Sequence, residues 1–278
     1  MAMTAPTGLY AYGLTGARPQ QLALPGIDRR YPVFVLEKRG LHAIVSAIDI
    51  LDFQARAKRA FAALTQNAGV EAGSASEAGA EAETLLQAHE HVVATLMQEM
   101  PVVPFTFGTI LRDEQAAMKL LRDDELRFKS LLAVFTGKAE WGVKVYADRQ
   151  QFARHVAQTT PVLREQTEQR ARLSRGAAYL ASRKMEEELK NSAASRLASI
   201  TVTMFHALAD LACEAKPNKT LPRKLTGKQS DMVLNAAYLV ESEQAARFCR
   251  QGQALQEQYA PLGLSLEITG PWPPYNFI

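Results

Sequence analysis

Residues 31–48 have the sequence YPVFVLEKRGLHAIVSAI. The runs 31–36 and 41–48 are rich in β-branched and aromatic residues, which favour extended strands. The link between them is short and contains Gly40, which is typical of a hairpin turn. The aromatic segment 8–14 is a third candidate strand. The sequence therefore predicts a small antiparallel sheet near the amino terminus.

Helical periodicity follows this sheet. From Asp52, a candidate N-cap, apolar residues recur every three or four positions, and they do so again over residues 84–100. Between these helices, residues 66–83 are mostly Ala, Gly, Ser and Glu, with too little apolar surface to offset the entropy lost on ordering. We therefore expect a mobile insertion there. Pro101 and Pro104 end the second helix. Two shorter helices are predicted over 113–121 and 124–135.

The second half of the chain alternates strand and helix patterns. Residues 140–146 have the composition of a strand, and Asp148 is placed to cap a helix over 149–158. Residues 161–216 are almost all helix-forming and predict a helical hairpin or a long arm, bent near Gly176 or near Asn191. A buried strand, a helix and a last strand are then predicted over 232–240, 243–259 and 264–269.

This order of elements resembles a split β-α-β, ferredoxin-like unit, whose fourth strand would have to come from residues 221–226. At 278 residues the chain exceeds a typical single core, so we expect two domains. The predicted fold class is α+β. Residues 1–136 form an N-terminal α+β domain with a small antiparallel sheet. Residues 137–278 form a ferredoxin-like domain with long helices and a proline- and aromatic-rich tail over 270–278.

Composition excludes several classes of protein. The 32 basic residues are nearly matched by 29 acidic ones, and the arginines at 170, 172 and 175 lie beside Glu165 and Glu168, so no nucleic-acid-binding stripe is indicated. No uncharged apolar stretch of about 18 residues occurs, so no membrane span is expected. Cys213 and Cys249 lie in amphipathic segments, and the first residues lack the pattern of a signal peptide. These features predict a cytoplasmic protein.

The usual patterns of catalysis are missing from the sequence. Residues 227–230, GKQS, resemble part of a phosphate-binding loop, but Pro222 stands where its leading glycine should fall. His89 and His91 are two residues apart on a predicted helix, so they point in nearly opposite directions, one to the core and one to solvent. We therefore expect no catalytic residues, no metal and no cofactor, and the protein is predicted not to be an enzyme. The remaining alternative is an enzyme whose site matches none of these patterns.

The carboxyl-terminal segment 270–278, GPWPPYNFI, is the strongest local signal in the chain. Its three prolines hold the backbone extended. Aromatic side chains on a stiff backbone lose little entropy on docking, so we expect Trp272, Tyr275 and Phe277 to be buried in a groove. The groove belongs either to this molecule or to a partner, and we favour the former because apolar termini are normally tied down.

This tail, with the preceding residues 262–269, closely resembles the end of the gas vesicle GvpF/GvpL family. Further matches to that family are GLYAYG at 8–13, HEHVV at 89–93, PVVPFTFGT at 101–109 and LNAAYLV at 234–240. The resemblance extends over nearly the whole chain. Within these matches, Thr106 stands where a basic residue is common, which puts a charge-based role of that loop in doubt.

The resemblance implies a gas vesicle minor component or assembly factor without enzymatic activity. Its partners would be the small hydrophobic shell protein GvpA and other accessory Gvp proteins, with GvpA protected from premature aggregation while vesicles form. The oligomeric state stays open. The alternative hypothesis is a cytosolic regulatory protein that binds a small molecule on the ferredoxin-like sheet.

The loop framed by Pro101 and Pro104 supplies candidates for an apolar contact with a partner or between domains. Its apolar side chains are Val102, Val103, Phe105 and Phe107. A shell protein that must polymerise exposes apolar surface beforehand, and matching apolar side chains would hold it. The competing interpretation is that these residues simply pack beneath the neighbouring helices.

Overall fold

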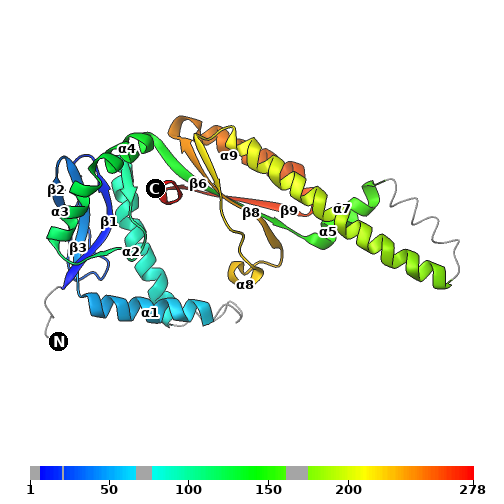
Figure 1. The fold of residues 1–278 in the computed structure, drawn as a ribbon, viewed down its shortest axis with the longest axis horizontal. Helices are drawn as coiled ribbons and strands as arrows, with labels where there is room; N and C mark the ends of the chain where they lie inside the picture. Colours follow the sequence, from blue (N-terminus) through cyan, green and yellow to red (C-terminus); the bar gives the residue numbers. More distant parts are fainter. Residues whose placement is uncertain (1–6, 21, 67–76, 161–174) are drawn as a thin grey trace. The chain divides into compact units, whose positions relative to one another are not determined.

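The structure, a computed structural model, describes residues 7–20, 22–66, 77–160 and 175–278. It is an α+β protein with two sheets (Figure 1). Contacts within the chain divide it into two compact units, Met1–Glu140 together with Pro271–Ile278, and Trp141–Gly270. The predicted domains, 1–136 and 137–278, differ from these units mainly in the tail, which the sequence pattern assigns to the second domain. Residues of the tail form hydrogen bonds with His89 and Glu140 of the first unit.

The first unit is built on β1, Gly8–Thr15, because all eight residues of this strand are buried. Antiparallel partners lie on both sides of it, in the order β2-β3-β1-β4. The bounds of these partners are Val33–Lys38 for β2, Leu41–Ile48 for β3 and Val102–Pro104 for β4. A further short strand, β5 (Ile110–Leu111), also pairs with β1. The predicted antiparallel sheet and its hairpin are therefore present.

Four described helices belong to the first unit. They are α1 (Ile50–Gln66), α2 (Glu77–Glu99), α3 (Glu114–Asp123) and α4 (Glu125–Phe135). Helix α2 packs on β1 and β4, and α3 packs on β2 and β3. On the α2 side, Tyr10 and Tyr12 of β1 join a buried cluster with Phe53 of α1 and with Leu85 and Val92 of α2. A strand that is covered in this way has no exposed side, which explains why β1 carries almost no polar residue.

The second unit contains a sheet in the order β7-β8-β6-β9. These strands are β6 (Lys138–Ala147), β7 (Glu214–Pro217), β8 (Asp231–Glu241) and β9 (Leu264–Trp272). The first residues of β6, up to Glu140, and the last two of β9, from Pro271, count with the first unit. The helices are α5 (Arg149–Thr159), α7 (Arg175–Ala209), the single turn α8 (Arg223–Thr226) and α9 (Ala245–Tyr259). Three short 3-10 turns complete the described chain, at Ser242–Gln244, Ala260–Leu262 and Tyr275–Phe277.

The structure corrects several expectations about element boundaries. Asp49, rather than Asp52, caps α1, because its carboxylate accepts the backbone N–H of Asp52 at 3.1 Å. Residues 77–83 of the expected mobile insertion belong to α2, while 67–76 lie outside the described residues.

The long helical segment includes one long helix, which ends earlier than expected, and the fourth strand lies elsewhere. Helix α7 runs without interruption past Asn191 and ends at Ala209, and residues 161–174 lie outside the described part. The fourth strand is Glu214–Pro217 and not 221–226. Glu214–Pro217 is a strand because its four residues pair with four residues of β8.

Gly13 allows the close approach of β4 to β1. A Cβ atom at this position would lie 2.6 Å from the carbonyl oxygen of Val103. We expect Gly13→Ala to lower the free energy of unfolding by about 1–3 kcal/mol, because backbone would have to move. Gly16→Ala is the matched control, since its Cβ would make an ordinary 3.5 Å contact with Leu132. Urea unfolding of both variants measures the effect, and equal stability would contradict this account of the sheet.

Candidate interaction site

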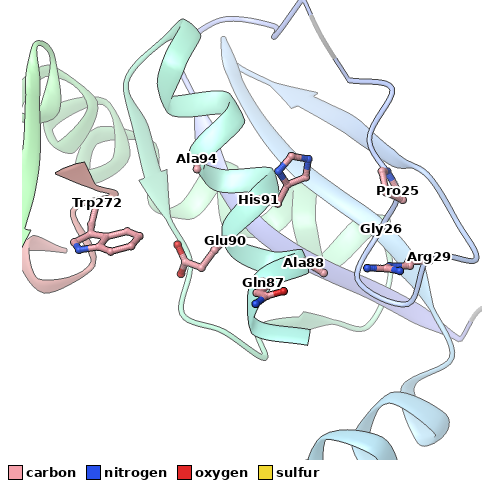
Figure 2. A pocket seen from close by; sticks show the side chains of 9 residues that line it. All are labelled: Pro25, Gly26, Arg29, Gln87, Ala88, Glu90, His91, Ala94 and Trp272. Atoms are coloured by element: carbon pink, nitrogen blue, oxygen red, sulfur yellow. The ribbon is translucent and has the colours of Figure 1, made fainter. Parts of the chain in front are cut away.

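A surface pocket of about 490 Å³ lies on the first unit, over helix α2 (Figure 2). Its lining comes from α2, from the loop before β2 and from the tail: Pro25, Gly26, Arg29, Gln87, Ala88, Glu90, His91, Ala94 and Trp272. Glu90 points toward Trp272, and His91 points toward the loop that carries Pro25 and Arg29 (Figure 2). The pocket thus joins an exposed aromatic ring to acidic and basic side chains.

The loop that carries Arg29 is fixed by its own backbone and by neighbouring charges. The backbone N–H of Gly26 donates to the carbonyl of Tyr31 at 2.8 Å, and Arg29 has a positive φ of 61°. Arg30 forms ion pairs with Asp28 and Asp52. A tight turn held in this way keeps the exposed Arg29 at the edge of the pocket.

Behind the pocket, His89 is the centre of a buried hydrogen-bonded network. Its side chain is 1% exposed, with Nδ1 2.9 Å from the Tyr10 hydroxyl and Nε2 3.0 Å from the Tyr275 hydroxyl. The backbone N–H of Gly108 donates to the Tyr10 oxygen at 3.1 Å. The Tyr275 hydroxyl donates to Glu90, so its oxygen is left to accept from the imidazole. We therefore assign the histidine proton to Nε2, and Nδ1 accepts from the Tyr10 hydroxyl.

Burial sets the charge of this network. It lowers the pKa of His89 from 6.5 to about 4, so the imidazole is neutral at pH 7. Burial also raises the pKa of Glu90, an effect that a hydrogen bond from Tyr275 partly opposes. The pKa of Tyr275 is raised by burial first and then by the charge of Glu90. Tyr10, His89 and Tyr275 are therefore joined by hydrogen bonds between neutral groups.

The tail is anchored on the first unit by its last residues. Asn276 donates its backbone N–H to one carboxylate oxygen of Glu140 at 2.8 Å, and its side-chain amide to the other at 2.6 Å. Phe277 is 6% exposed and Glu140 is also 6% exposed. Trp272, by contrast, is 45% exposed at the pocket. Tyr275 and Phe277 thus lie inward as anchors, whereas Trp272 lies outward, contrary to the expectation that all three are buried.

Of the four residues proposed for an apolar patch, the two valines lie in the core and the two phenylalanines are half-buried. Val102 and Val103 are 1% and 0% exposed, because β4 pairs with β1 under the helices. Phe105 packs near Phe128 of α4, and Phe107 lies against the rings of Tyr10, Phe53 and His89. The competing interpretation, packing beneath neighbouring helices, describes Val102 and Val103, whereas Phe105 and Phe107 are half-buried and stay candidates for a contact.

Sequence reasoning missed Arg29 and Glu140 as parts of the site. A buried acid within a strand is a signal that could have singled out Glu140, but its partner Asn276 is 136 residues away. The two histidines lie as their spacing predicted, with His89 buried and His91 exposed. Within the described ranges, no group of three or more His, Cys, Asp or Glu side chains is placed to hold a metal ion. None of the described helices is both long and apolar enough to cross a bilayer.

These features define a two-unit α+β protein whose first unit holds an aromatic side chain at a surface pocket. The chain belongs to the gas vesicle synthesis protein GvpL/GvpF family, whose model matches residues 8–278. The resemblance drawn from the sequence is thereby confirmed.

Individual relatives agree with this assignment. Gas vesicle protein L of a Streptomyces species is 29% identical over 195 residues, which are 69% of this chain and 67% of that protein. Gas vesicle protein F of the same strain is 29% identical over 194 residues, 69% of this chain and 76% of its own length. Crystal structures of GvpF from Anabaena and from Microcystis aeruginosa share the fold. Their TM-scores are 0.69 and 0.65, at 21% and 22% identity, with 98% of each chain covered.

The depressed pKa of His89 predicts how stability depends on pH. In the unfolded chain the imidazole takes up a proton near pH 6.5, whereas the folded protein resists until about pH 4. The unfolded state therefore binds more protons, and stability falls as the pH drops through this window, by at most about 1.4 kcal/mol per pH unit. We expect His89→Gln to be less stable at pH 7 but to lose less stability between pH 7 and pH 5.

Denaturant unfolding at a series of pH values tests this prediction. His91→Gln is the matched control, because it removes an exposed histidine of the same helix and should keep the wild-type pH dependence. If His89→Gln shows the same slope as the wild-type protein, the buried imidazole is not the titrating group.

Proposed function

We propose that this chain is a gas vesicle assembly factor or minor component that holds the shell protein GvpA and other accessory Gvp proteins through side-chain contacts. In this proposal it limits premature GvpA aggregation and helps vesicles to nucleate, and it makes and breaks no covalent bond. Its place is the cytoplasm and the gas vesicle. Membership of the GvpL/GvpF family supports the gas vesicle role.

The observation that carries the contact mechanism is the fixed, exposed indole of Trp272. The hydrogen bonds of Tyr275 and Asn276, a few residues further on, hold the tail on its own unit. A large aromatic side chain that is already ordered loses little entropy when it docks, and tryptophan is enriched among residues that dominate binding energy. Arg29 and Glu90 at the same pocket would supply the polar rim of such a contact.

We also infer a ferredoxin-like arrangement for the second unit. Its elements follow the order strand, helices, strand, strand, helix, strand, and its sheet has the order β7-β8-β6-β9. This order supports the split β-α-β interpretation of the sequence. In our proposal the unit is a scaffold, whereas the alternative regulatory protein would bind a metabolite on this sheet. Thermal shift with nucleotides and metabolites separates the two, since a tight ligand raises the melting temperature by mass action.

Trp272→Ala tests the proposed contact. With the tagged protein immobilised, we expect wild type to retain purified GvpA, and the variant to bind it more than tenfold more weakly, because an aromatic anchor is lost. Leu126→Ala is the matched control, since Leu126 is also apolar and is 82% exposed on α4 of the same unit. It should bind like the wild-type protein.

Two results would speak against the proposal at different levels. Absence of GvpA retention by the wild-type protein, alone or with other Gvp proteins, would overturn the function. Retention that Trp272→Ala leaves unchanged would keep the function and overturn this site. Unfolding midpoints of both variants verify that the fold is intact, because both side chains are exposed.

A further inference from the structure

The loop between β7 and β8 of the second unit, residues 218–230, is called here the basic finger. It has the sequence NKTLPRKLTGKQS, with four basic residues and no acidic one. Its local excess of four positive charges is larger than the net +3 of the entire chain. The charge of this protein is therefore balanced overall but concentrated here.

The basic finger is an ordered structure. Asn218 donates its backbone N–H to the carbonyl of Asn235 at 2.7 Å, and the side chain of Asn235 donates to the carbonyl of Lys219 at 2.9 Å. At its centre is the helical turn α8, which ends at Gly227 with a φ of 66°. Arg223 pairs with Asp231 of β8 at 2.5 Å. These bonds fix the backbone from which the remaining side chains project.

Two lysines and two leucines are among the exposed residues of the basic finger. Arg223 and Lys228 are neutralised by Asp231 and Glu267, whereas no ion pair to Lys219 or Lys224 occurs in the part of the chain that the structure describes. Leu221 is 39% exposed and Leu225 is 58% exposed. An ordered loop that holds exposed leucines among unneutralised lysines has the composition of an interface, an apolar centre with a charged rim.

We propose that the basic finger is a second docking surface, which binds an acidic amphipathic segment of a partner protein. The carboxylates of that segment meet Lys219 and Lys224, and its apolar side chains cover Leu221 and Leu225. This surface lies on a different unit from Trp272, and the proposal does not depend on GvpA binding there. Charge steers the encounter, while the leucines supply the buried area.

The composition of the basic finger favours a protein over other polyanions. A single-stranded nucleic acid is usually held by stacking on aromatic side chains, and residues 218–230 include none. An anionic membrane attracts a basic segment by about 1 kcal/mol per charge, so two free lysines and two leucines would give only weak attachment. A folded partner gains more, because it can enclose both leucines while pairing both lysines.

The experiment uses the full-length protein and a labelled helical peptide with leucines on one face and glutamates on the other. We expect fluorescence anisotropy to show binding that weakens more than tenfold in Lys219→Glu/Lys224→Glu and in Leu221→Ser/Leu225→Ser. Binding should also weaken at about 1 M salt, where the screening length falls to about 3 Å. A peptide with glutamine in place of each leucine should bind more than tenfold more weakly.

Lys184→Glu/Lys190→Glu on α7 is the matched control, since it changes the net charge of the same unit equally at two exposed lysines. It should bind the peptide like the wild-type protein. Absence of binding to the wild-type protein, or equal binding by the finger variants, would overturn the proposal. If an oligothymidylate, or vesicles rich in phosphatidylserine, bound more tightly than the peptide and the same variants weakened that binding, the proposal of a protein partner would be overturned. Circular dichroism controls for folding.

Discussion

The hydrogen bonds of the His89 imidazole to two tyrosine hydroxyls organise the first unit. One nitrogen meets Tyr10 of the central strand, and the other meets Tyr275 near the carboxyl terminus, so a helix, a strand and the tail share one buried group. An imidazole that is 1% exposed would be costly without partners. Both hydroxyls must therefore be in place, and the tail cannot leave without exposing or orphaning a ring nitrogen.

The same constraint explains why the three aromatic residues of the tail differ in exposure. Tyr275 and Phe277 face the first unit, beside the amide contacts of Asn276 with the buried Glu140. Trp272 precedes these anchors in the chain and is not needed to complete the buried network. Its indole therefore remains exposed at the pocket. Anchoring by neighbours leaves an apolar side chain ordered and available, which is the state in which an aromatic contact binds most strongly.

The two units carry different chemistry on their surfaces. The first presents an indole beside side chains of both signs, and the second presents an ordered basic loop with two leucines. Apolar contact is not weakened by the screening of charge, whereas the approach of an acidic partner is steered by charge over about 10 Å at ordinary ionic strength. A protein with both kinds of surface can bind an apolar partner at one and an acidic partner at the other. Similarity to solved GvpF chains at only 21–22% identity shows that the fold tolerates extensive change of sequence.

Local chemistry in the sequence determined most of the elements. The predicted strands at 8–14 and 41–48 and all but the first two residues of the one at 31–36 lie in strands. Asp148 caps its helix by accepting the N–H groups of Gln150 and Gln151. The opposite orientations of His89 and His91 followed from helical geometry alone. Such features depend on residues within one or two turns, so a single sequence carries them.

Only the tertiary structure decided which side chains are buried and which remain available. Val102 and Val103 could by their apolar character lie on a surface patch or in the core. The pairing of β4 with β1 places them in the core. The strand at Glu214–Pro217 exists because β8 supplies its hydrogen-bond partners, although its own composition is poor for a strand. The tail joined the first unit because Glu140 and His89, far away in the sequence, hold it there. These outcomes depend on contacts between distant residues, which no local pattern encodes.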